Sequence, residues 1–104
     1  MNAMPPTNSP IVAAFIARTT GSAANYAAAR RLFPGGVTHD SRYVRPHPLA
    51  IVRAQGARKW DVDGNEYVDY AGGHGALILG HAHPAVTARV TEQLARGTHY
   101  GANH

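Results

Sequence analysis

Hydrophobic positions near the start of the chain have helical spacing. An apolar run over 11–17 follows Ser9 and Pro10, the residue types that favour an N-cap and a first helical position. We therefore predict a short helix that begins at Pro10 and ends at Ala17. The residues before it are polar and proline-rich, and we expect 1–9 to be disordered.

A second helix is predicted after the break at Thr19-Thr20-Gly21. Its alanine-rich sequence favours helix, and Tyr26, Arg30 and Phe33 recur at helical intervals. Ser22 is the expected cap, and Phe33 the expected last residue, because Pro34-Gly35-Gly36 follows directly.

The periodicity changes to that of strands after a loop over 37–48. Strands are predicted over 49–54, 59–62 and 66–70, and Asp63-Gly64 between the last two is a strong hairpin signal. We therefore expect a small antiparallel meander over 49–70.

The last part of the chain returns to helical spacing. A glycine-rich loop over 72–75 and a short apolar segment over 77–79 precede His83-Pro84, where a helix is expected to start and run to a cap at Gly97. Its apolar positions, four residues apart, form one stripe: Val86, Val90 and Leu94.

Composition limits what this chain can be. Apolar residues make up 44% of its 104 residues but aromatic residues only 8%. A core this thin predicts either one modest α+β domain or a piece of something larger. A self-contained large enzyme is excluded, and the single lysine, Lys59, leaves little room for lysine chemistry.

Charge and cysteine content exclude further classes. The net charge is +4, but the arginines are scattered with no basic arm, so we expect no nucleic-acid partner. Without cysteine there is no disulfide and no thiolate metal site. We find no convincing leader and no apolar stretch of about 18 residues, so we expect no membrane association and a cytoplasmic protein.

Histidines cluster near the end of the chain, at His74, His81, His83, His99 and His104. His81 and His83 have a spacing that a metal can use, with His74 or His99 as a third ligand. No carboxylate or cysteine accompanies the pair, so we favour turn and N-cap roles beside Pro84 and expect no metal.

Three other patterns have an ordinary structural explanation. Asp61-x-Asp63-Gly64-Asn65 resembles the start of a Ca²⁺ loop, but its glycine is misplaced and its flanks are strand-like, which favours a hairpin turn. The loop over 72–75 lacks the spacing of a phosphate-binding fingerprint. Arg42 and Arg45 could clamp a carboxylate or could simply be solvated.

Taken together, three motifs resemble a known family. They are Pro34-Gly35-Gly36-Val37, then G-A-x-x-W-D-V-D-G-N-x-Y-x-D-Y over 56–70, then L-I-L-G-H-A-H-P over 77–84. In this order they resemble the N-terminal portion of class III pyridoxal-phosphate aminotransferases, in particular the glutamate-1-semialdehyde 2,1-aminomutase-like members. The resemblance extends from about Tyr26 to His104.

The resemblance implies the N-terminal part of a fold-type I, homodimeric enzyme that uses pyridoxal 5'-phosphate to move an amino group between amino-acid and keto-acid or aldehyde substrates. In the family, the Schiff-base lysine and the aspartate on the pyridinium nitrogen lie in a large domain downstream of the matched segment. We thus expect a flexible arm with a short helix over 1–21, a small-domain segment over 22–104 and no large cofactor-binding domain. Lys59 cannot replace that lysine, so we expect no catalytic residue here and an inactive chain alone.

Three positions carry over as substrate-binding residues. Arg42 lies five residues after the Pro-Gly-Gly-Val motif, where aminomutase-like members bind the substrate carboxylate. His74 occupies the place of a tryptophan that lines their pocket, and Gly73 that of a serine, which argues for another amino or keto acid, such as a β-amino acid. Tyr100 lies in a segment that runs near the active site and the dimer interface.

The resemblance also makes His81 and His83 family residues at a strand–helix junction. It further predicts that Val68, Leu77 and Val90 lack their normal cover in this segment. Two other functions stay open at this stage: a non-catalytic interaction fragment of the same fold, and a histidine-based metal-binding domain.

Overall fold

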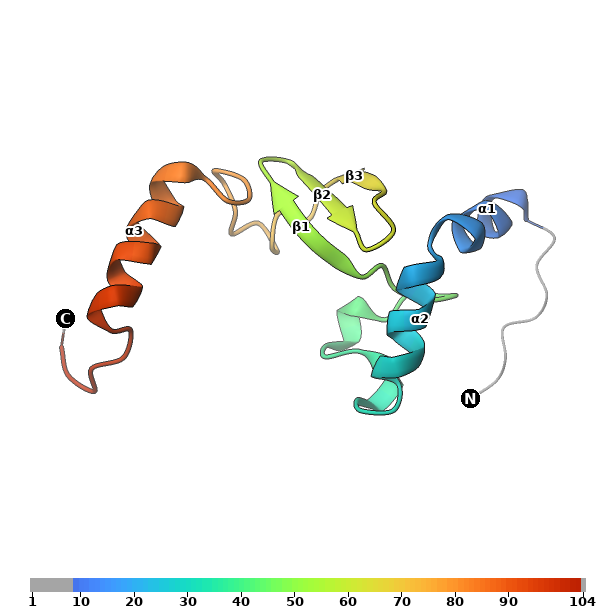
Figure 1. Cartoon of the computed structure of the whole chain (residues 1–104), viewed down its shortest axis with the longest axis horizontal. Coiled ribbons are helices and arrows are strands. Elements are labelled where there is room, and N and C mark those ends of the chain that lie inside the picture. The colour runs from blue at the N-terminus through green and yellow to red at the C-terminus, as the bar shows by residue number, and fades with distance from the viewer. Residues whose placement is uncertain (1–8, 104) are drawn as a thin grey trace. The chain divides into compact units, whose positions relative to one another are not determined.

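The structure is a computed structural model that describes residues 9–103. Its elements, in chain order, are α1 (Pro10–Arg18), α2 (Thr20–Ala29), the short 3-10 helices η1 (Pro34–Gly36) and η2 (Asp40–Arg42), the strands β1 (Ile51–Gln55), β2 (Arg58–Asp61) and β3 (Glu66–Val68), and α3 (Pro84–Arg96) (Figure 1). This confirms the predicted α+β order of helices, meander and helix. The stretch 1–8, expected to be disordered, and His104 lie outside the described residues.

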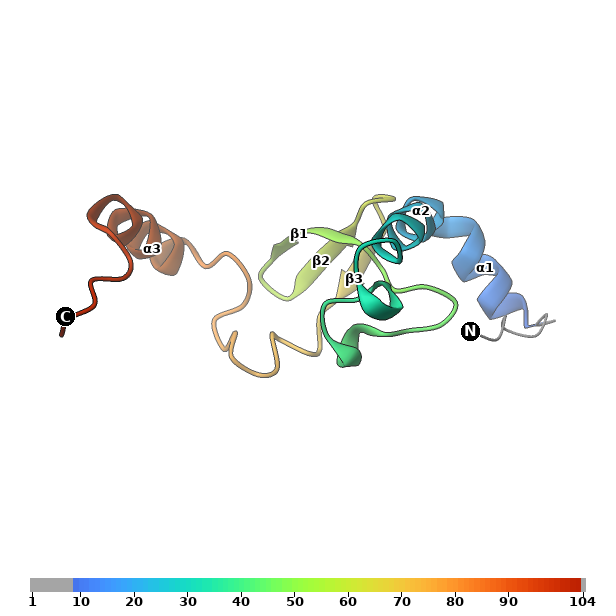
Figure 2. The same cartoon turned by 90° about the horizontal axis from the view of Figure 1, so that it is seen from below.

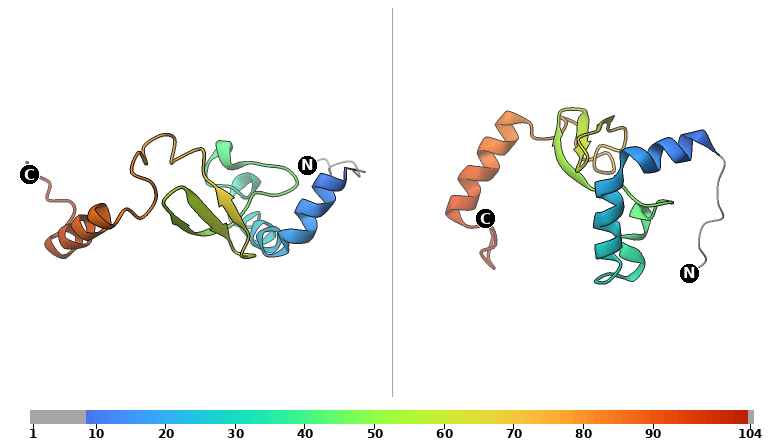
Figure 3. Two further views of the ribbon diagram at one scale, coloured as in Figure 1. Left: turned by 90° about the horizontal axis from the view of Figure 1, so that it is seen from above. Right: turned by 45° about the vertical axis from the view of Figure 1, so that its right-hand side comes forward.

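The first helix agrees with the prediction and the second does not. α1 begins at Pro10 after Ser9 and ends at Arg18, one residue later than expected. α2 begins at Thr20 instead of after a cap at Ser22, and it ends at Ala29 instead of Phe33. Only Thr19 separates the two helices, which meet at an angle (Figure 3).

The early start of α2 has a tertiary cause. Ser22 is buried inside the first turn, and the carboxylate of Asp63 accepts hydrogen bonds from the N–H groups of Gly21 and Ser22. The cap that the sequence analysis assigned to Ser22 is therefore supplied by a side chain from the hairpin.

The turn after α2 depends on one glycine. Gly36 has a φ of +72°, and a Cβ atom there would lie 2.6 Å from Cε2 of Tyr26 and 2.7 Å from Cγ of Arg30. Only glycine permits both this conformation and this close approach to α2. Pro34-Gly35-Gly36 is therefore a genuine stop signal, although α2 has already ended at Ala29, five positions before Pro34.

The meander is a three-stranded sheet in the order β1-β2-β3, with the strands side by side (Figure 2). The predicted hairpin is confirmed: Gly64 N–H donates to the carbonyl of Asp61 at 3.1 Å, and Asp61 N–H donates to that of Asn65 at 3.1 Å. The last helix is also confirmed, because α3 follows His83 and ends before Gly97, whose φ is +97°.

The described chain forms two compact units. The first comprises residues 9–53 and 59–67, and the second comprises residues 54–58 and 68–103. In the first, Thr19 Oγ1 donates to the carbonyl of Phe15 at 2.6 Å and lies 2.9 Å from Nε2 of the buried His47. Since the single hydroxyl proton goes to Phe15, Nε2 of His47 is the donor in that contact.

No hydrophobic side chain among residues 9–103 is buried. Val68 is 46% exposed, Leu77 38% and Val90 52%, which confirms that these three residues lack cover. Each unit is therefore held together internally mainly by backbone and side-chain hydrogen bonds, and its apolar side chains are exposed. Within the same residues, no helix is long and apolar enough to cross a membrane.

Candidate functional site

Arg42 is presented by a short 3-10 turn in the loop between α2 and β1. The turn is fixed by His39, whose Nδ1 accepts a hydrogen bond from Ser41 N–H at 3.2 Å. Arg42 donates from Nη1 to Oγ1 of Thr38 at 2.7 Å and is otherwise exposed. A guanidinium anchored at one nitrogen keeps further N–H groups for an incoming carboxylate.

A shallow hollow of about 510 Å³ lies in the same loop region. Its lining consists of Pro34, Val37, Thr38, His39, Asp40 and Tyr43. Thr38 thus belongs both to this hollow and to the anchor of Arg42, which places the candidate carboxylate-binding side chain next to a concave surface.

His74 lies at the tip of the loop over 70–80. Its φ is +59°, a left-handed conformation that non-glycine residues seldom adopt, and its neighbours Gly73 and Gly75 also have positive φ angles. The imidazole is exposed. A strained, exposed residue at a loop tip is a typical feature of ligand-binding positions.

Tyr100 folds back onto the end of α3. Its hydroxyl lies 2.9 Å from the carbonyl oxygen of Arg96 and 3.0 Å from that of Gly97, and it accepts a hydrogen bond from Nε2 of Gln93 at 2.8 Å. The residue is 47% exposed. Tyr100 therefore holds the carbonyls at the helix end and remains partly exposed.

The three predicted residues are divided between the two units. Arg42 belongs to the first unit, whereas His74 and Tyr100 belong to the second. Each of the three has an exposed surface for a ligand.

Asp61 organises a buried polar cluster that the sequence analysis took for a simple turn. Its carboxylate, 1% exposed, accepts hydrogen bonds from the hydroxyl of Tyr67 at 2.8 Å and from the N–H of Asn65 at 2.8 Å. Burial raises the pKa of Asp61, but the hydrogen bonds from Asn65 and Tyr67 outweigh it and hold the pKa below its ordinary value. Burial and the bond to Asp61 raise the pKa of Tyr67 to about 12.

The Asp61 cluster is a structural feature. Its acceptor oxygens are already used by protein donors, as Nδ2 of Asn65 adds contacts at 3.0 and 3.3 Å. This arrangement agrees with the hairpin interpretation and leaves no open carboxylate for Ca²⁺.

A pair formed by a carboxylate and an imidazole lies in the second unit. Oδ2 of Asp69 is 2.6 Å from Nε2 of His81, and the Asp69 side chain is only 6% exposed. The two residues are twelve positions apart, so no local periodicity could have indicated this contact. The only available signal was that both fall within the family motifs.

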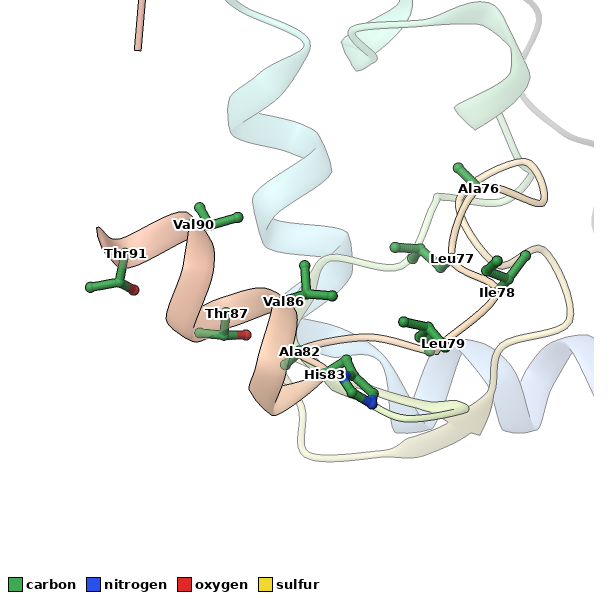
Figure 4. A pocket seen from close by; sticks show the side chains of 11 residues that line it. Ala76, Leu77, Ile78, Leu79, Ala82, His83, Val86, Thr87, Val90 and Thr91 are labelled. Atoms are coloured by element: carbon green, nitrogen blue, oxygen red, sulfur yellow. The ribbon is translucent and has the colours of Figure 1, made fainter. Parts of the chain in front are cut away.

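His83 precedes α3, as expected, beside an apolar groove of about 330 Å³ (Figure 4). Leu77 and Leu79 form one wall, and Val86 and Val90 on α3 form the other. Nδ1 of His83 is buried without a hydrogen-bond partner. Across residues 9–103, no three histidine, aspartate or glutamate side chains gather as a metal site.

The described residues do not by themselves fit pyridoxal phosphate. Lys59, the only lysine, is half-buried on β2 beside Trp60. It lines neither the hollow near Arg42 nor the groove at α3. No chemical step through the cofactor can therefore be derived from this segment.

Comparison with known proteins gives one consistent result. The family model for class-III aminotransferases matches residues 39–103. The glutamate-1-semialdehyde 2,1-aminomutase of Chloroflexus aurantiacus is 51% identical over 88 residues, which cover 82% of this chain and 20% of the relative. The chain thus spans about a fifth of the length of the curated relatives it matches.

Solved structures agree. A β-phenylalanine aminotransferase from Variovorax paradoxus superposes with a TM-score of 0.82 at 28% identity, covering 88% of this chain and 21% of that one. A glutamate-1-semialdehyde aminomutase from Pseudomonas aeruginosa gives a TM-score of 0.78 at 35% identity, covering 86% and 20%.

Proposed function

Because the chain belongs to the class-III aminotransferase family, we propose that it is the N-terminal segment of a pyridoxal-phosphate-dependent enzyme that transfers an amino group between amino-acid and keto-acid or aldehyde substrates. The observation that carries this proposal is the family match over 39–103, joined to 51% identity with an aminomutase over 88 residues.

The proposed role of this segment is substrate recognition. Arg42 binds the substrate carboxylate, because it combines a fixed backbone turn, one anchored nitrogen and exposed N–H groups. Two parallel hydrogen bonds from a guanidinium match the geometry of a carboxylate. Arg42 is thus the main source of binding energy that this segment offers to a carboxylate substrate.

His74 and Tyr100 are proposed to line the same substrate site. An imidazole is smaller and more polar than the indole that aminomutase-like members carry, so we propose a substrate other than glutamate semialdehyde. A β-amino acid is the first candidate, and the likeness to a β-phenylalanine aminotransferase supports it. The amino donor and acceptor then differ from those of the aminomutase relatives.

Pyridoxal phosphate is proposed to be held by a large domain outside this segment. When bound, the cofactor takes up electrons from the substrate carbon that carries the amino group. The segment's own residues orient the substrate toward it and supply no lysine to it. The proposed organisation is an N-terminal arm over 1–21 and a small-domain segment over 22–104.

A homodimer in the cytoplasm completes the proposal. The open apolar side chains of the groove at α3 support the idea that further polypeptide of the same enzyme packs on this segment. Sedimentation of the holoenzyme measures the proposed dimer directly.

The test is an assay of amino-group transfer by the full-length protein, with and without added pyridoxal phosphate. We expect transfer that depends on the cofactor and is unchanged in Lys59→Ala. The proposal is wrong if the cofactor-loaded protein transfers no amino group from α- or β-amino acids, or if Lys59→Ala abolishes transfer.

A non-catalytic interaction fragment is the second candidate function. The absence of any buried hydrophobic side chain within 9–103 favours it, because open apolar faces suit a binding partner. An 11.1 kDa native polypeptide that binds another protein and transfers no amino group would support it.

A further inference from the structure

The loop over 70–80 is closed at a neck by backbone hydrogen bonds. Gly56 and His81 exchange two N–H···O bonds, each 2.8 Å, and Asp69 N–H donates to the carbonyl of Ala57 at 2.8 Å. Both ends of the loop are thus attached to the turn between β1 and β2. The ends of this loop therefore lie close together, as they do in Ω-loops.

A side-chain pair closes the same neck. Oδ2 of Asp69 lies 2.6 Å from Nε2 of His81, and Oδ1 of Asp69 accepts a hydrogen bond from Ala71 N–H at 3.1 Å. With the carboxylate only 6% exposed, water competes poorly for these bonds. Asp69 therefore joins Ala71, at the start of the loop, to His81, which directly follows the end of the loop.

The neck is also sterically tight. Gly80 has a φ of +79°, and a Cβ atom there would lie 2.9 Å from the backbone of Gly56. The close approach of these two glycines lets His81 reach Gly56 and the carboxylate of Asp69 at once.

His74 depends on this neck for its position. Its imidazole has no hydrogen-bond or ion-pair partner among residues 9–103, so its place is set by the backbone alone. That backbone is left-handed from Gly72 to Gly75 and is held by bonds from Gly75 N–H to Ala71 and from Leu77 N–H to Gly72, each 3.0 Å. All of these lie inside the loop that Asp69 and His81 close.

We propose that Asp69 and His81 are positioning residues: their hydrogen-bonded pair holds the 70–80 loop closed and thereby places His74 at the substrate. The placement at the substrate rests on the proposed function, whereas the closure of the loop stands on geometry alone. The pair tunes which amino or keto acid is accepted, without touching the reacting atoms.

Hydrogen exchange of the full-length protein tests the closure. In the wild type we expect slow exchange at Gly56, Ala71 and His81. The loss of a hydrogen bond to a charged group changes an opening equilibrium constant about tenfold or more. We therefore expect Asp69→Ala and His81→Ala to speed amide exchange over 70–81 about tenfold. His81→Gln, which keeps an N–H donor, should restore slow exchange.

Asp63→Ala is the matched control, since it removes a carboxylate that holds α2 instead of the loop. We expect it to speed exchange at the start of α2 and to leave 70–81 unchanged. Unprotected loop amides in the wild type, or equal effects of Asp63→Ala and Asp69→Ala on the loop, would overturn the proposal.

Kinetics test the link to His74. Asp69→Ala should raise KM for the amino-acid substrate while kcat stays within about twofold, and it should add nothing to His74→Ala in the double variant. Additive effects on KM, or a loss confined to kcat, would refute placement through His74. A protein that shows the expected exchange but no amino-group transfer would refute the proposed function and leave the loop closure intact.

Discussion

Oδ1 of Asp63 lies 2.6 Å from the backbone nitrogen of Gly21, although 42 positions separate the two residues along the chain. Oδ2 of the same carboxylate accepts from Ser22 N–H at 3.0 Å and from the Ser22 hydroxyl at 3.2 Å. The hairpin thus caps a distant helix, and a negative charge at a helix N-terminus is favourable. Chiefly the bond from Gly21 holds the pKa of Asp63 below its ordinary value.

Replacing this cap should loosen α2. We expect Asp63→Ala to lower the melting temperature measured by circular dichroism, since it leaves two helix N–H groups without their acceptor. Asp40→Ala is the matched control, because that side chain is 94% exposed. Equal melting temperatures for the two variants would contradict the capping role.

Acid should unfold the protein through Asp61. The folded-state pKa of this carboxylate lies below its ordinary value, so its contribution to stability is present above about pH 4 and is lost as the pH falls further. At neutral pH, Asp61→Ala should cost about 1–3 kcal/mol of unfolding free energy, since its donors lose their acceptor.

Urea unfolding between neutral and acid pH measures this dependence. Asp61→Asn should be less stable than the wild type at neutral pH and should show a flatter decline toward acid. A decline as steep as that of the wild type would show that other groups cause the acid unfolding.

Tyr67 should resist ionisation. Its folded-state pKa is raised to about 12, so its phenol stabilises the fold fully below about pH 10, and that contribution is lost as the pH rises through 12. The difference between the tyrosinate absorbance titrations of the wild type and Tyr67→Phe isolates this group. A midpoint near 10 would contradict the buried hydrogen bond to Asp61.

Gly36 should tolerate no side chain. A methyl group there would clash with Tyr26 and Arg30 at 2.6 and 2.7 Å, so we expect Gly36→Ala to cost about 1–3 kcal/mol. Gly35→Ala is the matched control, because Gly35 also has a positive φ but a Cβ atom there would contact only Val37, at 3.9 Å. The difference in stability between the two variants therefore measures the clash apart from the backbone strain. Chemical denaturation that finds the two variants equally stable would rule out the clash.

Arg42 should control substrate binding in the full-length enzyme. We expect Arg42→Ala to raise KM for the carboxylate substrate about tenfold or more, which corresponds to about 1.5–3 kcal/mol for a lost charged hydrogen bond, with kcat little changed. Arg42→Lys should fall between, because it keeps the charge but not the two parallel donors.

Arg45→Ala is the control for Arg42, since it removes an exposed arginine three residues away in the same loop. If the two alanine variants have the same KM, Arg42 does not bind the substrate.

Local signals predicted the fold where the cause of the structure is local. The Asp63-Gly64 hairpin, the start of α1 at Pro10 and the helix between His83 and Gly97 were all predicted correctly. The predicted start of α2 was wrong because its cap comes from Asp63, which no pattern within the helix reveals.

The candidate site was less accessible to sequence reasoning. Arg42, His74 and Tyr100 came from a family resemblance, and the spacing of residues alone would have left Arg42 as one solvated arginine among nine. The contact between Asp69 and His81 depends on a loop that returns to the same turn, so it required the structure.

We propose above all that this chain is the N-terminal segment of a larger cofactor-dependent enzyme. The most direct measurement is the mass of the native polypeptide from its own cells, after borohydride reduction with pyridoxal phosphate and mapping of the modified lysine. We predict a mass several times 11.1 kDa and a cofactor bonded to a lysine outside this segment. A native polypeptide of 11.1 kDa, or a cofactor bonded to Lys59, would contradict this proposal.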